Sequence, residues 1–258
     1  MKKIILVNKK EGGTPLMALE SFRGRQIKNN KSYKDIKITY AGRLDPMASG
    51  LLLLLAGDEV KNKEKYLKLD KEYEFEILFG FATDTYDILG KVLPIPIRAN
   101  GTMSRQELEQ KIKQNLKYFK GKFIQKYPLY SSKTVNGKQL FEYGRGGVDV
   151  ILPEREVFVK NIKFLKIRTI SSKKLLENIQ KRIKKVKGDF RQKEILKIWG
   201  RNLKNKKEVF FIGSFKIKCS SGTYVRGVAD SLGEKLGTGA IAYFIKRTKI
   251  GKWSKIRE

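Results

Sequence analysis

The alternation of hydrophobic and polar residues predicts strands along much of the chain. In residues 71–79 the apolar side chains of Tyr73, Phe75 and Ile77 alternate with charged ones, as on a strand with one buried face. Five consecutive leucines between glycines, residues 51–55, favour a buried strand over the start of a buried helix. Further strand-like stretches are residues 2–7, 123–130, 157–170 and 210–219.

Helical spacing and capping residues predict helices between these strands. They cover residues 16–27, 104–119 and 228–236. Thr14 can cap the first helix, with Pro15 at its first position. Ser104 and Glu107 have the spacing of a capping box at the start of the second. Asn136-Gly137 is typical of a hairpin turn.

Residues 171–208, which we call the arm, have a different composition from the rest of the chain. They hold fourteen Lys or Arg against four Asp or Glu, a net charge of +10. Apolar residues between 175 and 186 keep an approximate helical spacing, and a second helix is expected near 195–199. Two interpretations remain open: a solvated helical excursion, and an arm that contacts RNA.

Composition narrows the class of protein. The 258 residues can bury a sizeable core, and 57 Lys and Arg against 26 Asp and Glu give a formal net charge of +31. A globular protein with a polyanionic partner, such as nucleic acid, explains this balance. The alternative is a proteome that is generally rich in lysine.

The absence of histidine restricts the possible chemistry. With no histidine and only Cys219, the chain cannot form an internal disulfide, a Cys/His zinc site or a Ser-His-Asp triad. The apolar run near the N-terminus is too short for a signal peptide, and no later stretch is long enough to span a membrane. We therefore expect a cytoplasmic protein with no membrane association.

Asp45 is the most conspicuous candidate for chemistry. It lies between Arg43 and Pro46, directly before the leucine run. The proline favours an extended backbone at Asp45, and Gly42 and Gly50 allow sharp turns that could point the carboxylate into a cleft. A plainer interpretation is an Asp-Pro turn with a neighbouring arginine as its partner.

Several stretches together resemble the TruB-type tRNA pseudouridine-55 synthases. The resemblance covers most of the chain outside the arm, and the order and approximate spacing of the motifs make it specific. The matching residues are Lys9, Gly12, Thr14, Pro15, Ala41, Gly42, Leu44-Asp45-Pro46-Met47-Ala48-Ser49-Gly50, Lys71, Tyr73, Gly80, Thr83-Asp84-Thr85, Asp87, Gly90, Tyr130, Ser131, Gly137, Arg145 and Ser221-Gly222-Thr223-Tyr224-Val225-Arg226.

The resemblance implies an α+β pseudouridine synthase fold, in which helices flank a mixed, mostly antiparallel sheet. It implies that Asp45 is the catalytic aspartate, that Tyr73 stacks on the target base and that Arg226 pairs with the aspartate. By the same resemblance Tyr224 and Ile245 line the pocket. We also expect Lys9, Tyr40 and Arg43 to contact the substrate.

The implied reaction suits these residue types. Uridine is cut from its sugar at N1 and rejoined through C5, which needs an ionised carboxylate and walls that retain the freed base. An adjacent cation favours the charged form of a carboxylate, and aromatic rings hold a flipped base by stacking. Tyr73 is also a candidate base or proton relay, with pure stacking as the alternative. No cofactor or metal is expected, and the sequence does not decide whether the aspartate attacks the base or the sugar.

The chain departs from the family pattern at several positions. Tyr40 replaces a usual histidine, Arg43 a usual Thr or Ala, and Thr134 a usual lysine, which affects RNA contacts more than chemistry. The chain stops at Glu258, so the PUA-like C-terminal RNA-binding module common in the family is expected to be absent, and the arm is a candidate substitute. We therefore expect one catalytic domain, residues 1–258, acting as a monomer on the T-arm of tRNA.

Two other functions remain open. A guide-RNA-dependent pseudouridine synthase subunit shares the Gly-x-Leu-Asp-Pro core, although Met47, Ala48 and Ser49 favour the stand-alone bacterial type. A non-catalytic RNA-binding or RNA-folding protein would also explain the charge and the substitutions at Tyr40, Arg43 and Thr134.

Overall fold

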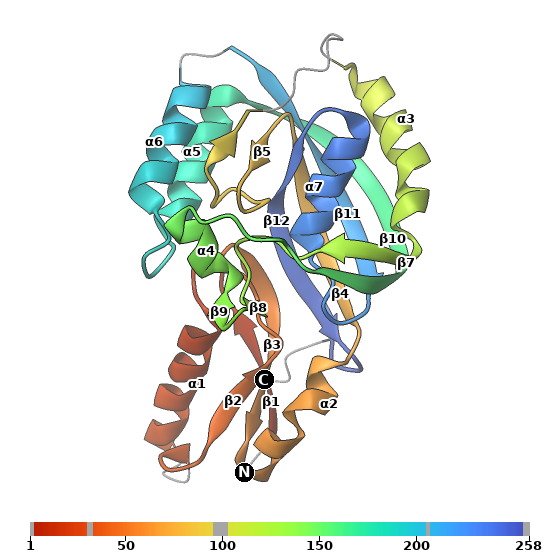
Figure 1. Cartoon of the computed structure of the whole chain (residues 1–258). Helices are drawn as coiled ribbons and strands as arrows, with labels where there is room; N and C mark the ends of the chain where they lie inside the picture. The colour runs from red at the N-terminus through yellow and green to blue at the C-terminus, as the bar shows by residue number, and fades with distance from the viewer. Residues whose placement is uncertain (1–2, 30–32, 95–102, 205–206, 255–258) are drawn as a thin grey trace.

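One eight-stranded sheet runs through the computed structural model, which describes residues 3–29, 33–94, 103–204 and 207–254. Its strands are β1 (Ile4–Lys9), β2 (Ile38–Ala41), β3 (Ala48–Ala56), β4 (Lys71–Phe79), β7 (Gly121–Lys126), β10 (Glu154–Ser171), β11 (Val209–Cys219) and β12 (Ala240–Ile250). The order is β1-β3-β12-β4-β11-β10-β7, and β2 pairs with β3 (Figure 1). Only the pairing of β3 with β12 is parallel among these described strands, so the expected mixed, mostly antiparallel sheet is confirmed.

The five-leucine run lies in β3, as predicted, and is buried on both faces. Leu52 and Leu54 pack with α1 (Pro15–Asn29), whereas Leu51, Leu53 and Leu55 pack toward α2 (Lys63–Leu67). A strand covered on both sides loses the alternation of polar residues, which explains the continuous apolar run. Helix α1 begins at Pro15, and the Thr14 hydroxyl accepts a hydrogen bond from the Met17 amide at 3.2 Å.

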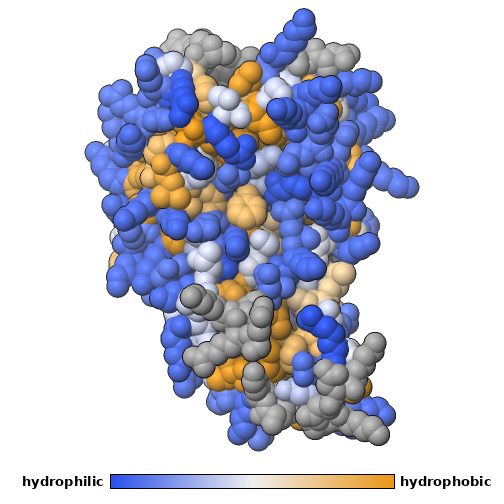
Figure 2. All heavy atoms as spheres, turned by 180° about the vertical axis from the view of Figure 1, so that it is seen from behind, coloured by the Kyte–Doolittle hydropathy of each residue, from blue (hydrophilic) through white to orange (hydrophobic). Residues whose placement is uncertain are grey.

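Hydrophilic side chains cover most of the upper part of the molecule when it is viewed from behind (Figure 2). This surface accords with the excess of 57 Lys and Arg over 26 Asp and Glu. None of the helices within the described residues has both the length and the apolar character that crossing a membrane requires.

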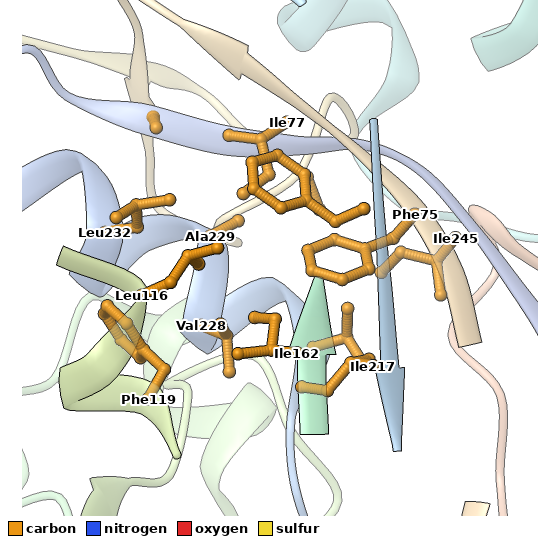
Figure 3. Packing of buried hydrophobic residues seen from close by; sticks show 14 of the residues in the cluster. Phe75, Ile77, Leu116, Phe119, Ile162, Ile217, Val228, Ala229, Leu232 and Ile245 are labelled. Atoms are coloured by element: carbon orange, nitrogen blue, oxygen red, sulfur yellow. The ribbon is translucent and has the colours of Figure 1, made fainter. Parts of the chain in front are cut away.

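The main core lies on one face of the sheet, beneath α3 (Arg105–Asn115), the 3-10 turn η3 (Leu116–Phe119) and α7 (Val225–Leu236). Figure 3 shows Val228, Ala229 and Leu232 of α7 with Phe75 and Ile77 of β4 in this core. The predicted capping box of α3 is confirmed: Ser104 and Glu107 exchange both hydrogen bonds. The third predicted helix is α7, which begins three residues earlier than the spacing indicated.

The arm covers the opposite face of the sheet. It folds into α5 (Ser172–Ile183) and α6 (Gln192–Leu203), so the two predicted helices are confirmed. Their apolar faces join a second core, in which the fully buried Trp199 ring lies 5.0 Å from that of Phe81. The arm is therefore not a solvated excursion, because its apolar side is part of the folded core.

The remaining described elements are short. They are the 3-10 turn η2 (Gly57–Asn62), β5 (Ala82–Thr83), β6 (Val92–Leu93), β8 (Thr134–Val135), β9 (Lys138–Gln139) and α4 (Leu140–Gly146). The predicted hairpin turn joins β8 to β9, and both Asn136 and Gly137 have positive φ. The predicted strand over 123–130 is wrong at its end: β7 stops at Lys126, and Pro128, which lacks an amide hydrogen, cannot extend the ladder.

Candidate active site

Asp45 lies in the loop between β2 and β3, just before β3 begins beside β12. Its carbonyl accepts a hydrogen bond from the Ala48 amide at 3.0 Å, which closes a turn over Pro46. Gly42 and Gly50 have φ of +84° and +104°, values that favour glycine. Gly42 lies in a bend before Asp45, as predicted, whereas Gly50 lies within β3, so the turn predicted on that side is wrong. At Gly50 a Cβ atom would clash with the backbone of β12, which explains why that position requires glycine.

Arg226, in the first turn of α7, holds the Asp45 side chain. Its Nε donates to Asp45 Oδ2 at 2.7 Å, Nη1 to the Thr85 carbonyl at 2.8 Å and Nη2 to the Tyr130 carbonyl at 2.8 Å. The guanidinium is 3% exposed, whereas the carboxylate is 38% exposed. The arginine is thus fixed from three sides inside the protein, and the aspartate keeps a face that a substrate can reach.

A second carboxylate, Asp87, lies behind this pair. It is buried and accepts hydrogen bonds from Thr85 Oγ1 at 2.7 Å and from the Leu89 amide at 2.9 Å. Burial raises the pKa of Asp87 to about 6, and the Arg226 guanidinium opposes the rise. Asp87 belongs to one of the family-like motifs, although no role was predicted for it, and its negative charge favours the charged form of the buried Arg226 guanidinium.

Tyr73 lies in β4, in register with Arg247 of β12. Burial raises the pKa of the Tyr73 phenol, and the neighbouring Arg247 guanidinium opposes this shift. Arg247 is itself buried and donates to the carbonyls of Leu51 at 2.7 Å, Gly42 at 3.2 Å and Arg43 at 3.3 Å. It therefore braces the Asp45 loop and the phenol together.

Tyr224 caps α7, immediately before the arginine-bearing turn. Gln125 of β7 fixes its backbone through two hydrogen bonds, accepting from the Tyr224 amide at 2.9 Å and donating to its carbonyl at 3.0 Å. The Tyr224 ring meets the Tyr127 ring edge-on at 5.8 Å and lies 5.4 Å from the Arg226 guanidinium. Sequence reasoning missed Gln125, because its role appears only when β7 approaches α7.

Ile245 supplies an apolar wall near the start of β3. It is buried, lies opposite Ala48 in the parallel ladder and belongs to the same core as Leu44 and Phe75. The residues on either side of Asp45 in the sequence are thus anchored in apolar packing. Of the residues expected to line the pocket, the structure brings Tyr224 to Arg226 and Ile245 to the Asp45 loop.

Lys9 is buried beneath the Asp45 loop. Its Nζ donates to the carbonyls of Gly13 at 2.7 Å, Lys10 at 3.2 Å and Pro46 at 3.4 Å. Burial lowers the pKa of Lys9 to about 8, and the nearby Asp45 carboxylate partly opposes this shift. These contacts brace the loop from inside the protein.

Tyr40 and Arg43, two positions where the chain departs from the family pattern, differ in their surroundings. Arg43 is exposed, and its Nη1 donates to Ser132 Oγ at 2.7 Å. Tyr40 packs partly against the core around α1, with Lys63 Nζ 5.8 Å from the centre of its ring. Arg43 therefore lies on the rim of the site, whereas the contacts of Tyr40 are directed to the N-terminal part of the sheet.

Within the described part of the chain, no three His, Cys, Asp or Glu side chains gather as metal ligands would. What the residues do provide is an accessible carboxylate held by a buried guanidinium, with aromatic and apolar side chains around it. Such a site can stabilise positive charge, or attack an electron-poor atom, next to a stacked planar ring.

Comparison with known proteins identifies the family. Residues 26–188 match the model of the TruB family pseudouridylate synthases (N terminal domain), which is more than half of the chain. The chain belongs to the TruB family. This match includes the Asp45 loop, Tyr73 and the Thr83–Asp87 segment, and it ends within the arm.

Curated members of the TruB family are similar over most of the chain. One from Caldicellulosiruptor saccharolyticus is 30% identical over 97% of this chain and 68% of its own length. Another, from Lactobacillus acidophilus, is 32% identical over 82% of this chain and 58% of its own length. Both are named tRNA pseudouridine synthase B, and both are considerably longer than the segment they share with this chain.

Solved structures share the fold. The chain superposes on a crystal structure of a Cbf5-Nop10-Gar1 complex with a TM-score of 0.55 and 19% identity, over 98% of this chain and 50% of that one. It also superposes on an H/ACA RNP bound to a substrate RNA, with a TM-score of 0.54 and 18% identity, over 98% of this chain and 48% of that one. At these identities the likeness establishes the pseudouridine synthase fold alone.

Proposed function

We propose that this TruB-family chain isomerises the T-loop uridine of tRNA, position 55, to pseudouridine. The observation that carries the proposal is the Asp45 carboxylate, open on one side and held on the other by the buried Arg226. The names of the curated relatives suggest tRNA as the substrate. These relatives are 30% and 32% identical to this chain in sequence, whereas the protein in the Cbf5 complex is 19% identical to it. This difference favours the stand-alone tRNA enzyme over a guide-RNA-dependent subunit.

The reaction breaks the bond from uracil N1 to the ribose C1′ and forms one from C5 to C1′. A proton leaves C5 and N1 gains one, so atoms and electrons balance without a redox partner. Asp45 supplies negative charge while the bond to N1 breaks, as a nucleophile or as a stabiliser of the electron-poor centre. Arg226 fixes the carboxylate in position, so little reorganisation is needed during the reaction.

The freed base must turn without leaving. Tyr73, Tyr224 and Ile245 surround the Asp45 loop with aromatic and apolar surface, and stacking on such rings tolerates rotation of a planar base. We assign Tyr73 a second role, in which its hydroxyl relays the proton that leaves C5. Its raised pKa keeps the phenol uncharged at neutral pH, which suits a relay that both accepts and donates a proton.

The arm supplies part of the RNA-binding surface in this proposal. Lys184, Lys185 and Lys187 are exposed on the turn between α5 and α6, and the Lys187 amide donates to the Gly12 carbonyl at 2.9 Å, beside the Asp45 loop. Three lysines there can contact phosphates of a bound RNA.

Exchanging these three lysines for glutamine tests that contact. Each lost phosphate contact lowers the slope of log affinity against log salt by about 0.9. We expect weaker tRNA binding and a slope reduced by about two to three units, because up to three contacts are lost. An unchanged slope would assign phosphate binding to another surface.

The function itself is tested by mapping pseudouridine on total tRNA that lacks the modification, with and without the purified chain. We expect new pseudouridine at the T-loop uridine, and also on an isolated T-arm stem-loop. Product only in the presence of an added guide RNA would favour the guide-dependent subunit. Tight binding with no product after long incubation would favour an RNA-binding or RNA-folding protein.

A further inference from the structure

Arg191, the residue directly before α6, has an unusual backbone conformation. Arg191 has φ of +62°, a left-handed value that is uncommon for residues other than glycine. Its guanidinium donates to both carboxylate oxygens of Asp84, at 2.7 and 3.4 Å, and lies 4.1 Å from the centre of the Tyr130 ring. The strained backbone is thus held by contacts that its side chain makes outside the arm.

The two partners of Arg191 adjoin the groups that hold the catalytic arginine. Asp84 precedes Thr85, whose carbonyl accepts from Arg226 Nη1, and the carbonyl of Tyr130 itself accepts from Arg226 Nη2. Asp84 and Tyr130 lie 46 positions apart in the sequence. Arg226 joins their segments through these two carbonyls, and Arg191 is a second side chain that joins them, through Asp84 and the Tyr130 ring.

Arg182 and Lys187 of the arm contact the Asp45 loop indirectly, through residues 11 and 12. Arg182 donates to both carboxylate oxygens of Glu11, at 2.9 and 2.7 Å, and the Lys187 amide donates to the carbonyl of Gly12. The Gly12 amide in turn donates to the carbonyl of Pro46 at 2.9 Å, one residue from Asp45. At Gly12 a Cβ atom would lie 2.6 Å from the Lys185 carbonyl oxygen, so only glycine permits this approach.

We propose that residues 182–191 of the arm position the pair of Asp45 and Arg226. Arg191 acts through the segments whose carbonyls accept hydrogen bonds from Arg226, and Arg182 acts through the Asp45 loop. This rests on the proposed function and adds a role for the arm beyond phosphate binding. The guanidinium groups are suited to it because Arg191 is 18% exposed and Arg182 10%, and each already has a bidentate carboxylate partner. A guanidinium engaged in this way is not available to a phosphate.

If the arm positions the two groups in this way, variants of Arg191 or Arg182 should lose catalytic rate while they keep their affinity for tRNA. Loss of either guanidinium leaves the exposed lysines in place, so tRNA binding persists. The catalytic pair, however, gains freedom to move, and small misplacements of catalytic groups reduce rates steeply. Arg191→Gln and Arg182→Gln are the test variants, with Arg191→Lys and Arg182→Lys as milder changes that keep the charge but lose the bidentate geometry.

The experiment measures the single-turnover rate at saturating enzyme, the Kd for tRNA and amide hydrogen exchange in each variant. We expect the saturated rate to fall about 10- to 100-fold in the glutamine variants, with Kd changed less than twofold. Exchange should quicken in residues 84–91 for the Arg191 variants and in residues 43–48 for the Arg182 variants. Exchange in β4 and β11 should stay unchanged, as it would not if the whole fold were destabilised.

Arg201→Gln is the matched control, because it removes an exposed arginine from α6 without touching either contact. We expect its saturated rate and loop exchange to equal those of the wild type. Weaker binding at an unchanged saturated rate in the Arg191 and Arg182 variants would overturn the proposal and assign both groups to phosphate contact. Unchanged rate and unchanged exchange would overturn it as well.

Hydrogen exchange separates this inference from the proposed function. If the wild type forms no pseudouridine, the proposed function fails, but the exchange data still decide whether the arm fixes these loops. If the wild type is active and loop exchange in the variants is unaltered, the positioning role fails alone.

Discussion

A buried guanidinium determines how Asp45 can be altered without damaging the fold. Arg226 has one carboxylate and two carbonyls as hydrogen-bond partners. Removing the Asp45 carboxylate altogether leaves Asp87 as the remaining nearby negative charge, and loss of one partner of a buried ion pair typically costs up to about 3–5 kcal/mol. Asparagine keeps an oxygen that can accept from Arg226 Nε while removing the negative charge. Asp45→Asn is therefore the variant that separates chemistry from stability.

Tyr73→Phe separates the two roles assigned to this ring. Phenylalanine keeps the stacking surface and removes the hydroxyl beside Arg247. We expect tRNA affinity within about twofold of the wild type and a saturated single-turnover rate lowered about 10²-fold, since proton transfer by a positioned group contributes about 10²–10⁴-fold. A rate equal to that of the wild type would leave Tyr73 as a stacking residue only.

The roles of some site residues could be predicted from the sequence, and those of others could not. Asp45 and Arg226 are 181 positions apart, so composition and spacing could not pair them, and the family resemblance did. Arg247 and Gln125 went unassigned because both act on backbone groups of distant strands or loops. In β12 Arg247 stands between Lys246 and Lys249, so no feature of the sequence pattern marked it as the buried member of this basic run.

The arm illustrates what a helical pattern predicts and what it omits. Its apolar spacing correctly indicated two helices with buried faces, but spacing alone cannot name the surface that covers them. That surface is the sheet face around Phe81, Ile88 and Tyr243, which became available only through the tertiary fold. Replacing the arm with a short linker would therefore expose this core as well as remove charge, so single substitutions are the better probe.

Trp199→Ala tests whether the arm is part of the folded core. The indole is fully buried, and its Nε1 donates to the Ile88 carbonyl at 3.1 Å. We expect the free energy of unfolding, measured with denaturant, to fall by about 3–5 kcal/mol, as for other buried large aromatic residues. A loss below about 1 kcal/mol would mean that the arm is only loosely attached.

The whole molecule carries a formal charge of +31, yet two lysines are buried in it. Burial lowers the pKa of both Lys9 and Lys71 to about 8, and the Arg247 guanidinium near Lys71 acts in the same direction. Both lysines donate to backbone carbonyls, Lys71 to that of Leu67 at 2.7 Å. The protein thus keeps two ammonium groups in places that disfavour their charge.

This burial predicts that stability rises with pH between about 8 and 10. In that window the unfolded chain still binds the two protons and the folded chain releases them, so the free energy of unfolding increases with pH. Each lysine contributes up to about 1.4 kcal/mol per pH unit. Denaturant titrations at pH 7.5 to 10 should show the rise, and Lys9→Met or Lys71→Met should reduce it; a flat wild-type profile would contradict the assignment.

The Asp45 carboxylate, in the function proposed here, performs the isomerisation on a T-loop uridine. This role is tested most directly by the single-turnover rate of pseudouridine formation on a T-arm stem-loop, with wild type and Asp45→Asn each at saturating concentration. We expect product at the T-loop uridine with the wild type, a rate lower by about 10³-fold or more with the variant, and equal RNA affinity. Turnover by the variant at a rate near that of the wild type would contradict it.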